Sequence, residues 1–369
     1  MALIEGLRAC DGDAALRFEL ANYLRLASRH GEAIEQLQQV LMDDVVRVEA
    51  WRSLAQTYDE MGQPRARALA NVALGVFEVA TTAEREDIRA WRPRWDAIRP
   101  GALAGDATAD LHVARDQQAP SAALLASIVE GLAKVRPGDL SRWGVTSRDK
   151  LAARPDGLRA IVDRVASLFA VEDYDVFTHA LPDRGVLVEN TSRPSILIPA
   201  WLGDAEQGQQ VFAITEAIVN LARGTFTIDL FVPRELDILL AAAVRAQVPG
   251  FGEKVAAPDV LDDNMRAISK AVSRKRRRAY EIAAQAYATT RGPDTPTLVH
   301  WIRQSARRIA LVVADDLASC FAYTMRTEGV AGKVGIAAVR ASPVMADLLK
   351  VWAARPAMML RRTCGLLPS

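Results

Sequence analysis

The sequence predicts a mainly α-helical protein with a small β-sheet, an α+β fold, and three observations lead to this prediction. Near the start of the chain a set of small and apolar residues recurs 34 positions later: Leu20, Ala21, Leu24 and Ser28 return as Leu54, Ala55, Tyr58 and Gly62. A period of this length is typical of stacked helical hairpins. Between 174 and 199, short apolar runs bounded by turn residues indicate strands. From 207 onward, the apolar residues return to helical spacing.

The composition is that of a globular protein without a strong overall charge. Half of the 369 residues are hydrophobic, and 46 basic residues balance 45 acidic ones. No global field therefore attracts nucleic acid, a membrane or acidic ligands. The three cysteines form no CxxC pair and the four histidines are scattered, so we expect no metal and no cofactor. Without a signal peptide or an apolar stretch of ~18 residues, we expect a cytoplasmic protein with no membrane span.

The first domain, residues 1–95, is predicted to consist of helical hairpins. The first hairpin has helices near 14–28 and 31–43, and the second spans 48–81 with a turn at Gly62-Gln63-Pro64. Residues 2–9 match the second helix of an earlier, truncated repeat. The period, and the small residues where two helices must approach closely, resemble tetratricopeptide repeats, which implies a grooved surface for binding another protein.

The chain after the hairpins is predicted to contain a linker at 96–119 and a helical α+β domain at 120–369. The linker assignment rests on its proline, glycine and small polar residues. Three short strands are expected at 174–181, 185–189 and 195–199, forming a partly antiparallel sheet. Helices are expected at 120–135, 156–169, 207–223, 233–248, 259–290 (one long or two shorter), 296–322, 343–353 and 357–365.

The helix at 207–223 follows the strands in the same order as the active-site helix of minimal zinc peptidase domains. In those domains this helix carries HExxH, in which two histidines bind zinc and the glutamate activates water. The comparable pentad here is Thr215-Glu216-Ala217-Ile218-Val219. Glu216 keeps the acid, but both histidines are replaced, so the sequence indicates either a fold that has lost its metal or an ordinary helix with one glutamate.

A basic run lies inside the 259–290 segment, and its residues are Arg274, Lys275, Arg276, Arg277 and Arg278. Such runs can contact the phosphates of nucleic acid. The helical apolar spacing continues through this run, however, and the overall charge is neutral. We therefore favour a solvated helix face or a patch for an acidic partner over nucleic acid.

Beyond the hairpins, the chain is similar to the C-terminal regions of large tetratricopeptide-repeat proteins that are frequent in myxobacteria and related bacteria. The landmarks that carry this resemblance are residues 174–177, 193–198, 211–224, 235–236, 306–311 with 315–317, and 360–362. None of them is a catalytic signature. The resemblance implies a scaffold or a regulatory protein and implies no site residues.

From these observations we expect a non-catalytic scaffold or regulatory subunit that binds another protein or peptide through the groove of its repeats, with acidic segments among the expected partners. The predicted contact residues lie between the buried positions of the first helix in each hairpin, and they are Arg17, Asn22, Arg25, Arg52, Gln56 and Asp59. The three arginines favour acidic segments. The alternatives left open are an inactive metallopeptidase-like domain with Glu216 in a cleft, and nucleic-acid binding through 274–278.

Overall fold

The computed structural model describes residues 13–290, 292–329 and 333–368. It is mainly helical with one three-stranded sheet, which confirms the predicted fold class. The expected early helix at 2–9 lies outside the described residues. Contacts divide the chain into two units. Unit 1 combines Met1–Arg99 with Leu311–Ser369, and unit 2 is Pro100–Ala310.

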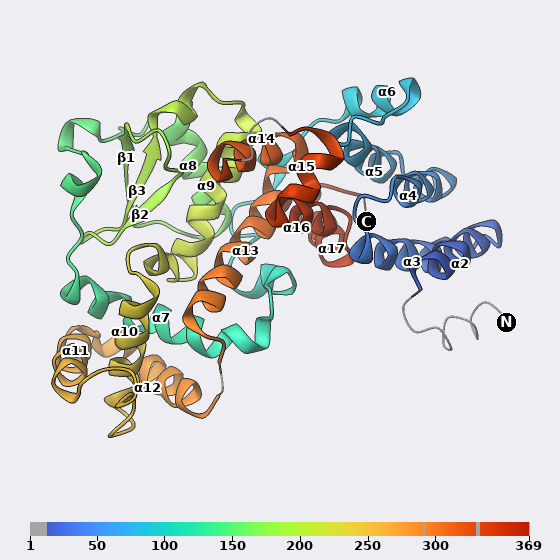
Figure 1. The fold of residues 1–369 in the computed structure, drawn as a ribbon. Coiled ribbons are helices and arrows are strands. Elements are labelled where there is room, and N and C mark those ends of the chain that lie inside the picture. The colour runs from blue at the N-terminus through green and yellow to red at the C-terminus, as the bar shows by residue number, and fades with distance from the viewer. Residues whose placement is uncertain (1–12, 291, 330–332, 369) are drawn as a thin grey trace. The chain divides into compact units, whose positions relative to one another are not determined.

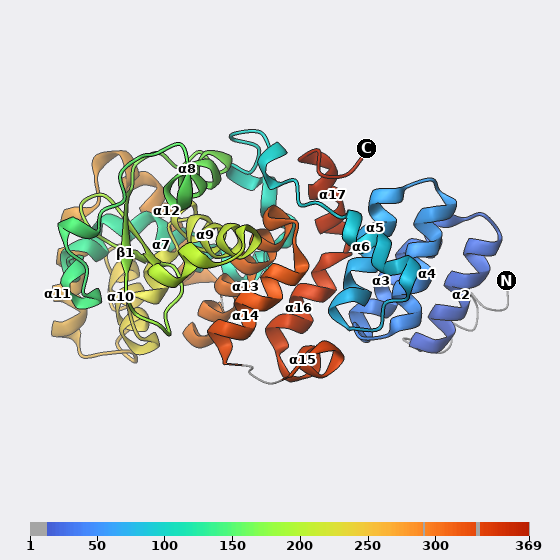
Figure 2. The same cartoon turned by 90° about the horizontal axis from the view of Figure 1, so that it is seen from above.

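Unit 1 begins with two helical hairpins at the spacing that the sequence indicates (Figure 2). Their helices are α2 (Ala14–Leu26), α3 (His30–Asp43), α4 (Val48–Glu60) and α5 (Pro64–Val76). Asp13 caps α2 by accepting the N–H groups of Ala15 and Leu16. The residues that recur along the chain are also equivalent in space, because Leu20, Ala21 and Leu24 are buried like Leu54, Ala55 and Tyr58.

A further helix, α6 (Thr82–Ala90), lies 34 residues after α4 and packs on α5. Thr81 and Glu84 close a capping box at its start. The rest of unit 1 comes from the other end of the chain and comprises α14 (Leu317–Glu328), α15 (Gly335–Ala341), α16 (Pro343–Trp352) and α17 (Arg355–Thr363). The expected division into 1–95, 96–119 and 120–369 assigns these helices to the second domain, whereas in the structure they pack with the hairpins.

One buried carboxylate joins the two chain segments of unit 1. Asp315 pairs with Arg65 of α5 at 2.7 Å and with Arg361 of α17 at 3.3 Å. Its backbone carbonyl accepts the indole N–H of Trp91 at 2.9 Å. Trp352 packs edge-on against Trp91 and donates its own indole N–H to the carbonyl of Leu69. One carboxylate thus pairs with two guanidinium groups from different helices beside a pair of tryptophans.

The prediction of one long helix at 296–322 is wrong, and Asp315 explains why. The chain forms α13 (Thr295–Ala314) and α14 as separate helices. Asp315 has a φ of 52°, a left-handed conformation that stops a helix. Asp316 then caps α14 by accepting the N–H of Ser319. Continuous apolar spacing through this stretch hides the break.

Unit 2 contains the sheet, whose strands are β1 (Asp175–His179), β2 (Leu187–Glu189) and β3 (Ser195–Pro199). The order is β1-β3-β2, with β1 parallel and β2 antiparallel to β3. Every residue of the central strand β3 is buried, as its apolar sequence predicts. Beside the sheet, α8 (Gly157–Leu168) packs on α9 (Gln207–Ala222) (Figure 1).

The main core of unit 2 lies between α7 (Arg115–Val135) and three later helices. The later helices are α10 (Pro233–Arg245), α11 (Pro258–Ala271) and α12 (Arg274–Thr289). The segment 259–290 therefore forms two helices, one of the two expected arrangements. Gly131 of α7 permits the close approach of α11, because a Cβ at this position would lie 2.9 Å from the Cα of Ile268.

The expected linker at 96–119 is folded against unit 2 from residue 100 onward. It contains η2 (Gly105–Leu111), and Leu103 and Leu111 are almost fully buried. The N–H groups of Gly101 and Leu103 bind the carbonyls of Ser167 and Leu168. The small polar residues that indicate a flexible linker here form tight turns instead. The short helices around it are η1 (Trp95–Ala97), η3 (Leu140–Trp143), η4 (Ser147–Asp149), η5 (Ala200–Asp204) and η6 (Phe226–Asp229).

Among the described residues, no helix combines the length and the apolar character that crossing a bilayer requires.

Candidate functional site

The six residues predicted to contact a partner lie on α2 and α4, but they are not equally accessible. Arg52, Gln56 and Asp59 on α4 are exposed. Arg17, Asn22 and Arg25 on α2 are only partly exposed, which corrects the expectation that all six face solvent. The reason is contact between the helices. Ser53 of α4 donates a hydrogen bond to Asn22 at 2.8 Å, and Arg25 reaches Glu60 at the end of α4.

Ion pairs organise the surface that these helices present. Glu60 accepts Arg25 at 2.5 Å and Gln56 at 3.2 Å, and the ring of His30 lies 3.4 Å away. The sequence analysis did not identify Glu60 and Ser53 as partners of the predicted residues. Each lies nearly one repeat from its partner, because 35 residues separate Arg25 from Glu60 and 31 separate Asn22 from Ser53. The repeat period was therefore the signal that could have found them.

A second set of pairs connects α4 to α5 and α6. Arg67 of α5 bridges Asp59 and Asp87, at 2.5 and 2.8 Å, and these hydrogen bonds raise the pKa of its guanidinium. Arg52 pairs with Glu84 at 2.9 Å, and this bond likewise raises the pKa of Arg52. The charged side chains are thus held in place by neighbours within unit 1. We call the surface formed by Asn22, Arg25, Arg52, Gln56, Asp59 and Glu60 the α2–α4 face.

The other helix of each hairpin is engaged by the C-terminal helices of the same unit. Gln38 of α3 donates to the carbonyl of Ala353 at 2.7 Å, and Glu35 pairs with Arg355. On α5, Arg65 donates to the carbonyl of Leu366. The chain therefore covers α3 and α5 itself, whereas Arg52, Gln56 and Asp59 of α4 stay exposed.

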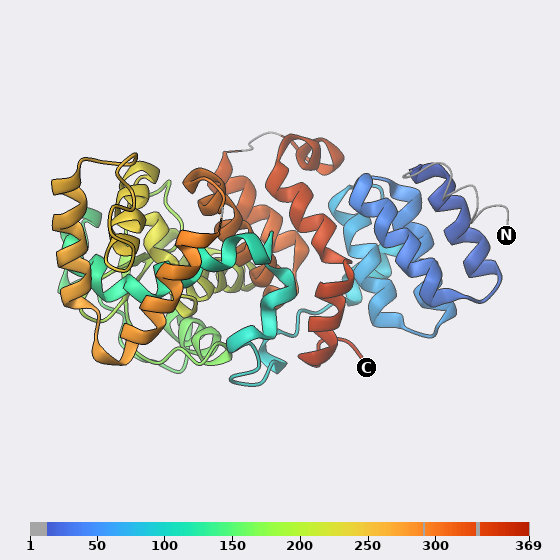
Figure 3. The same ribbon diagram turned by 90° about the horizontal axis from the view of Figure 1, so that it is seen from below.

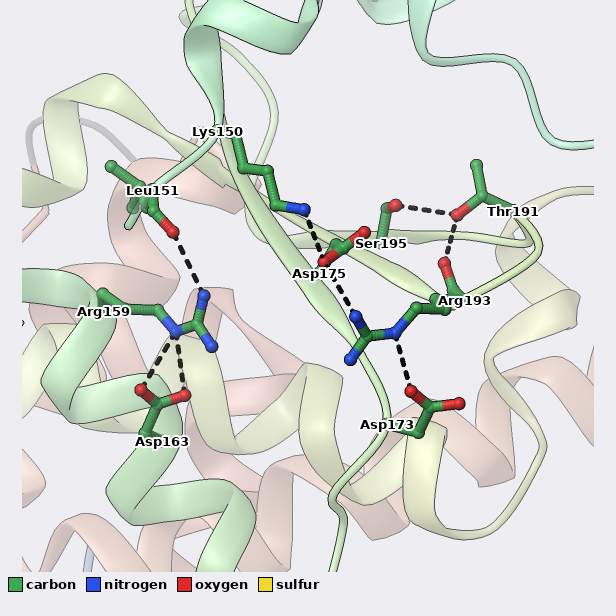
Figure 4. Close-up of polar contacts among 9 residues, drawn as sticks. All are labelled: Lys150, Leu151, Arg159, Asp163, Asp173, Asp175, Thr191, Arg193 and Ser195. Carbon is green, nitrogen blue, oxygen red and sulfur yellow. Dashed lines mark hydrogen bonds and ion pairs between the residues drawn. The ribbon is translucent and has the colours of Figure 1, made fainter. Parts of the chain in front are cut away.

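Unit 2 contains a polar hollow of about 580 Å³ at the start of α8. Its lining includes Lys150, Arg154, Asp156, Arg159, Gly203 and Gln210. Figure 4 shows two of its cations, Lys150 and Arg159, pointing toward neighbouring carboxylates. Lys150 lies 2.8 Å from Asp175, and Arg159 lies 2.8 Å from Asp163.

The ionic network beside this hollow is balanced in charge, with three cations facing three carboxylates. Arg193 pairs with Asp173 and, at 3.7 Å, with Asp175 (Figure 4). The Ser195 hydroxyl shares a hydrogen bond of 2.7 Å with the hydroxyl of Thr191. His179 uses both ring nitrogens on backbone groups, one toward the carbonyl of Gly185 and one toward the N–H of Leu181. The hollow is large enough for a small polar molecule. Because Lys150 and Arg159 already pair with carboxylates, the charges of the lining do not indicate which kind of ligand would bind.

The pentad considered as a lost metal site is part of the packed helix α9. Thr215 is buried and donates to the carbonyl of Val211, and Val219 is buried as well. Glu216 pairs with Arg307 of α13 at 2.9 Å. Across the described chain, no group of three His, Cys, Asp or Glu side chains is placed to hold a metal ion. The geometry gives Glu216 the role of an ion-pair partner between two helices.

The basic residues Arg274, Lys275, Arg276, Arg277 and Arg278 form the first turns of α12, and all five are exposed. Arg276 and Arg277 contact the neighbouring helices α7 and α11, which separates them from the other three.

Comparisons of the chain with protein-family models, with curated proteins and with solved structures found no match.

Proposed function

We propose that the protein is a non-catalytic interaction protein, that its two hairpins are tetratricopeptide-type repeats, and that the α2–α4 face binds a segment of another protein. One observation carries this proposal. The chain covers α3 and α5 with its own C-terminal helices and leaves polar, exposed residues on α4. Stacks of helical repeats commonly bind partners through such a surface.

The charges of the face narrow the partner's chemistry. In the Arg52–Glu84 pair the arginine side chain is 42% exposed and the glutamate 16%, so this part of the face is cationic toward solvent. At the other end of α4, Asp59 and Glu60 are more exposed than the arginines that pair with them. A segment with an acidic residue near Arg52 and a basic residue near Asp59 fits this order. The acidic preference expected from the arginines thus applies to one end of the face.

The apolar part of the face is Leu26, the last residue of α2, whose surface is 73% exposed. Exposed leucines are common and a single one does not define a site. Leu26 follows Arg25 at the C-terminal end of α2, so it lies at the border of the face. It supplies an apolar contact next to the charged ones.

The test is a charge swap that keeps the internal ion pair. Arg25→Glu with Glu60→Arg restores an attractive pair but reverses the charges that this pair presents on the face, while Arg52 and Asp59 stay unchanged. We expect partner proteins that co-purify with the wild-type chain from its native cell extract to be lost from this variant. Quantitative mass spectrometry of the eluates measures the loss.

A matched control is available on the same unit. Glu35 of α3 and Arg355 of α17 form an exposed pair on the side of the hairpins that the C-terminal helices occupy. The swap Glu35→Arg with Arg355→Glu reverses one ion pair in the same way outside the α2–α4 face, so it should retain the partners. Equal recovery of the same partners with both swaps would contradict the proposal.

A further inference from the structure

The first turns of α12 carry an excess of positive charge that the helix itself does not explain. Between 266 and 278 the chain has seven basic residues and no acidic one. Five of them open α12, where the helix macrodipole is positive and cations are unfavourable. Cations placed against the dipole need another reason, either contacts within the fold or a ligand.

Contacts within the fold account for two of the five. Arg276 pairs with Glu130 of α7 at 3.3 Å and donates to the carbonyl of Ala126. Arg277 donates to the carbonyls of Ser269 and Val272, at the end of α11. These two arginines link α12 to α7 and to the end of α11. The ribbon of α12 runs beside that of α7 (Figure 3).

The other three cations point outward together. Arg274, Lys275 and Arg278 are exposed and have no hydrogen-bond or ion-pair partner among the described residues. At about 100° per residue they fall within about 100° of the helix circumference. Gln285 and Thr289, which are also exposed, lie on the same arc further along the helix, together with Ile282, which is 60% exposed. The nearest carboxylate of the helix, Glu281, is partly buried and lies about 20° outside this arc.

We propose that the outward arc of α12, made of Arg274, Lys275, Arg278, Gln285 and Thr289, binds the phosphate backbone of a nucleic acid. Arg274 and Arg278 are four residues apart, a rise of about 6 Å. A DNA duplex carries one negative charge per ~1.7 Å of its axis, so this short cluster meets about three phosphates. An acidic helix offers carboxylates on one face only about once per turn. The density of cations therefore fits a nucleic acid better than an acidic peptide.

The rest of the arc supports the same partner. Glutamine is among the side chains that commonly hydrogen-bond phosphates and sugars, and Gln285 is exposed on the arc, whereas the Thr289 hydroxyl donates to carbonyls of its own helix. An anionic membrane is a poorer fit, because Ile282 is the one large apolar side chain on the arc and membrane-surface helices bury a broad apolar face. The near-neutral net charge of the whole chain means that the attraction is local to α12.

The test measures binding of a fluorescent, mixed-sequence DNA duplex and a single-stranded RNA to the full chain across salt concentrations. For about three phosphate contacts on duplex DNA, the logarithm of the affinity should fall with the logarithm of the salt concentration with a slope near −3. The variant Arg274→Gln, Lys275→Gln, Arg278→Gln should bind at least about tenfold more weakly and its slope should approach zero. Arg276 and Arg277 are kept, so α12 retains its contacts.

A control removes the same charge elsewhere. Arg148, Arg184 and Lys254 are exposed residues of the same unit, and replacing all three by Gln should leave binding and slope unchanged. Circular dichroism shows whether each variant is folded. An equal loss in the control, no binding by the wild type, or stronger binding of polyglutamate or of phosphatidylserine vesicles than of either nucleic acid would overturn the proposal.

Discussion

Arg361 is a fully buried cation whose partners lie far from it in the sequence. It pairs with Asp315, donates to the carbonyl of Trp352 at 2.7 Å, and stacks on the Trp352 ring. Arg361→Met should destabilise the protein by about 1–3 kcal/mol, because it removes the hydrogen bonds that Arg361 donates to Asp315 and to the Trp352 carbonyl, while Arg65 still pairs with Asp315. Urea unfolding measures the change. Arg362→Met, at the exposed neighbouring position, should change stability by less than about 0.5 kcal/mol. Similar effects of the two variants would contradict this role.

His112 makes the stability of unit 2 depend on pH. Burial, followed by the positive charges of Arg223 and Arg115, lowers the pKa of His112 to about 4. An unfolded chain protonates this ring near pH 6.5, so the unfolded state binds more protons between these two values. Stability from this group is therefore present at pH 7 and is lost as the pH falls from about 6.5 to about 4.

Replacing His112 should flatten this pH dependence. His112→Gln removes the titration, so the variant should lose less stability than the wild type between pH 7 and about pH 5, by ~1 kcal/mol after allowing for partial exposure. Urea unfolding at both pH values gives the difference. Equal losses in the two proteins would show that His112 does not titrate with a lowered pKa.

At the scale of elements, the break between α13 and α14 depends on two consecutive aspartates with different tasks. Asp315 turns the chain and binds arginines, whereas Asp316 caps α14 by accepting from the N–H and the hydroxyl of Ser319. Asp316→Ala should reduce stability by ~1 kcal/mol through loss of the cap. Asp43→Ala should be neutral or slightly stabilising, since a carboxylate at a helix C-terminus is unfavourable. Thermal unfolding distinguishes them, and an unchanged midpoint for Asp316→Ala would rule out the cap.

The same elements show how far the sequence leads. Local signals place the four hairpin helices and the three strands within a few residues, because apolar period, Pro64 and the turn residues act locally. The break at Asp315 escapes such reasoning, since its conformation is held by Arg65 and Arg361, which are remote in sequence. The half-buried state of Asn22 and Arg25 depends likewise on α4, so their exposure could not be read from α2 alone.

At the scale of the molecule, the hairpins depend on the far end of the chain. Trp352 bonds to Leu69 of α5 and packs on Trp91, and α17 supplies Arg361 to Asp315. Removing residues 343–369 should therefore uncover apolar surface on α5 and abolish the cooperative unfolding of unit 1. Hydrogen exchange in the peptides covering 48–76 reports this. Unchanged protection there would show that the hairpins are stable without the C-terminal helices.

The central claim is that the α2–α4 face receives a partner protein. Hydrogen exchange on the isolated complex of the chain with its co-purified partner tests it most directly, by comparing each peptide with the free chain. The account predicts added protection in peptides covering α2 and α4 around Arg25, Arg52 and Gln56, with little change in α3. Protection confined to other helices, with α2 and α4 exchanging as in the free chain, would contradict it.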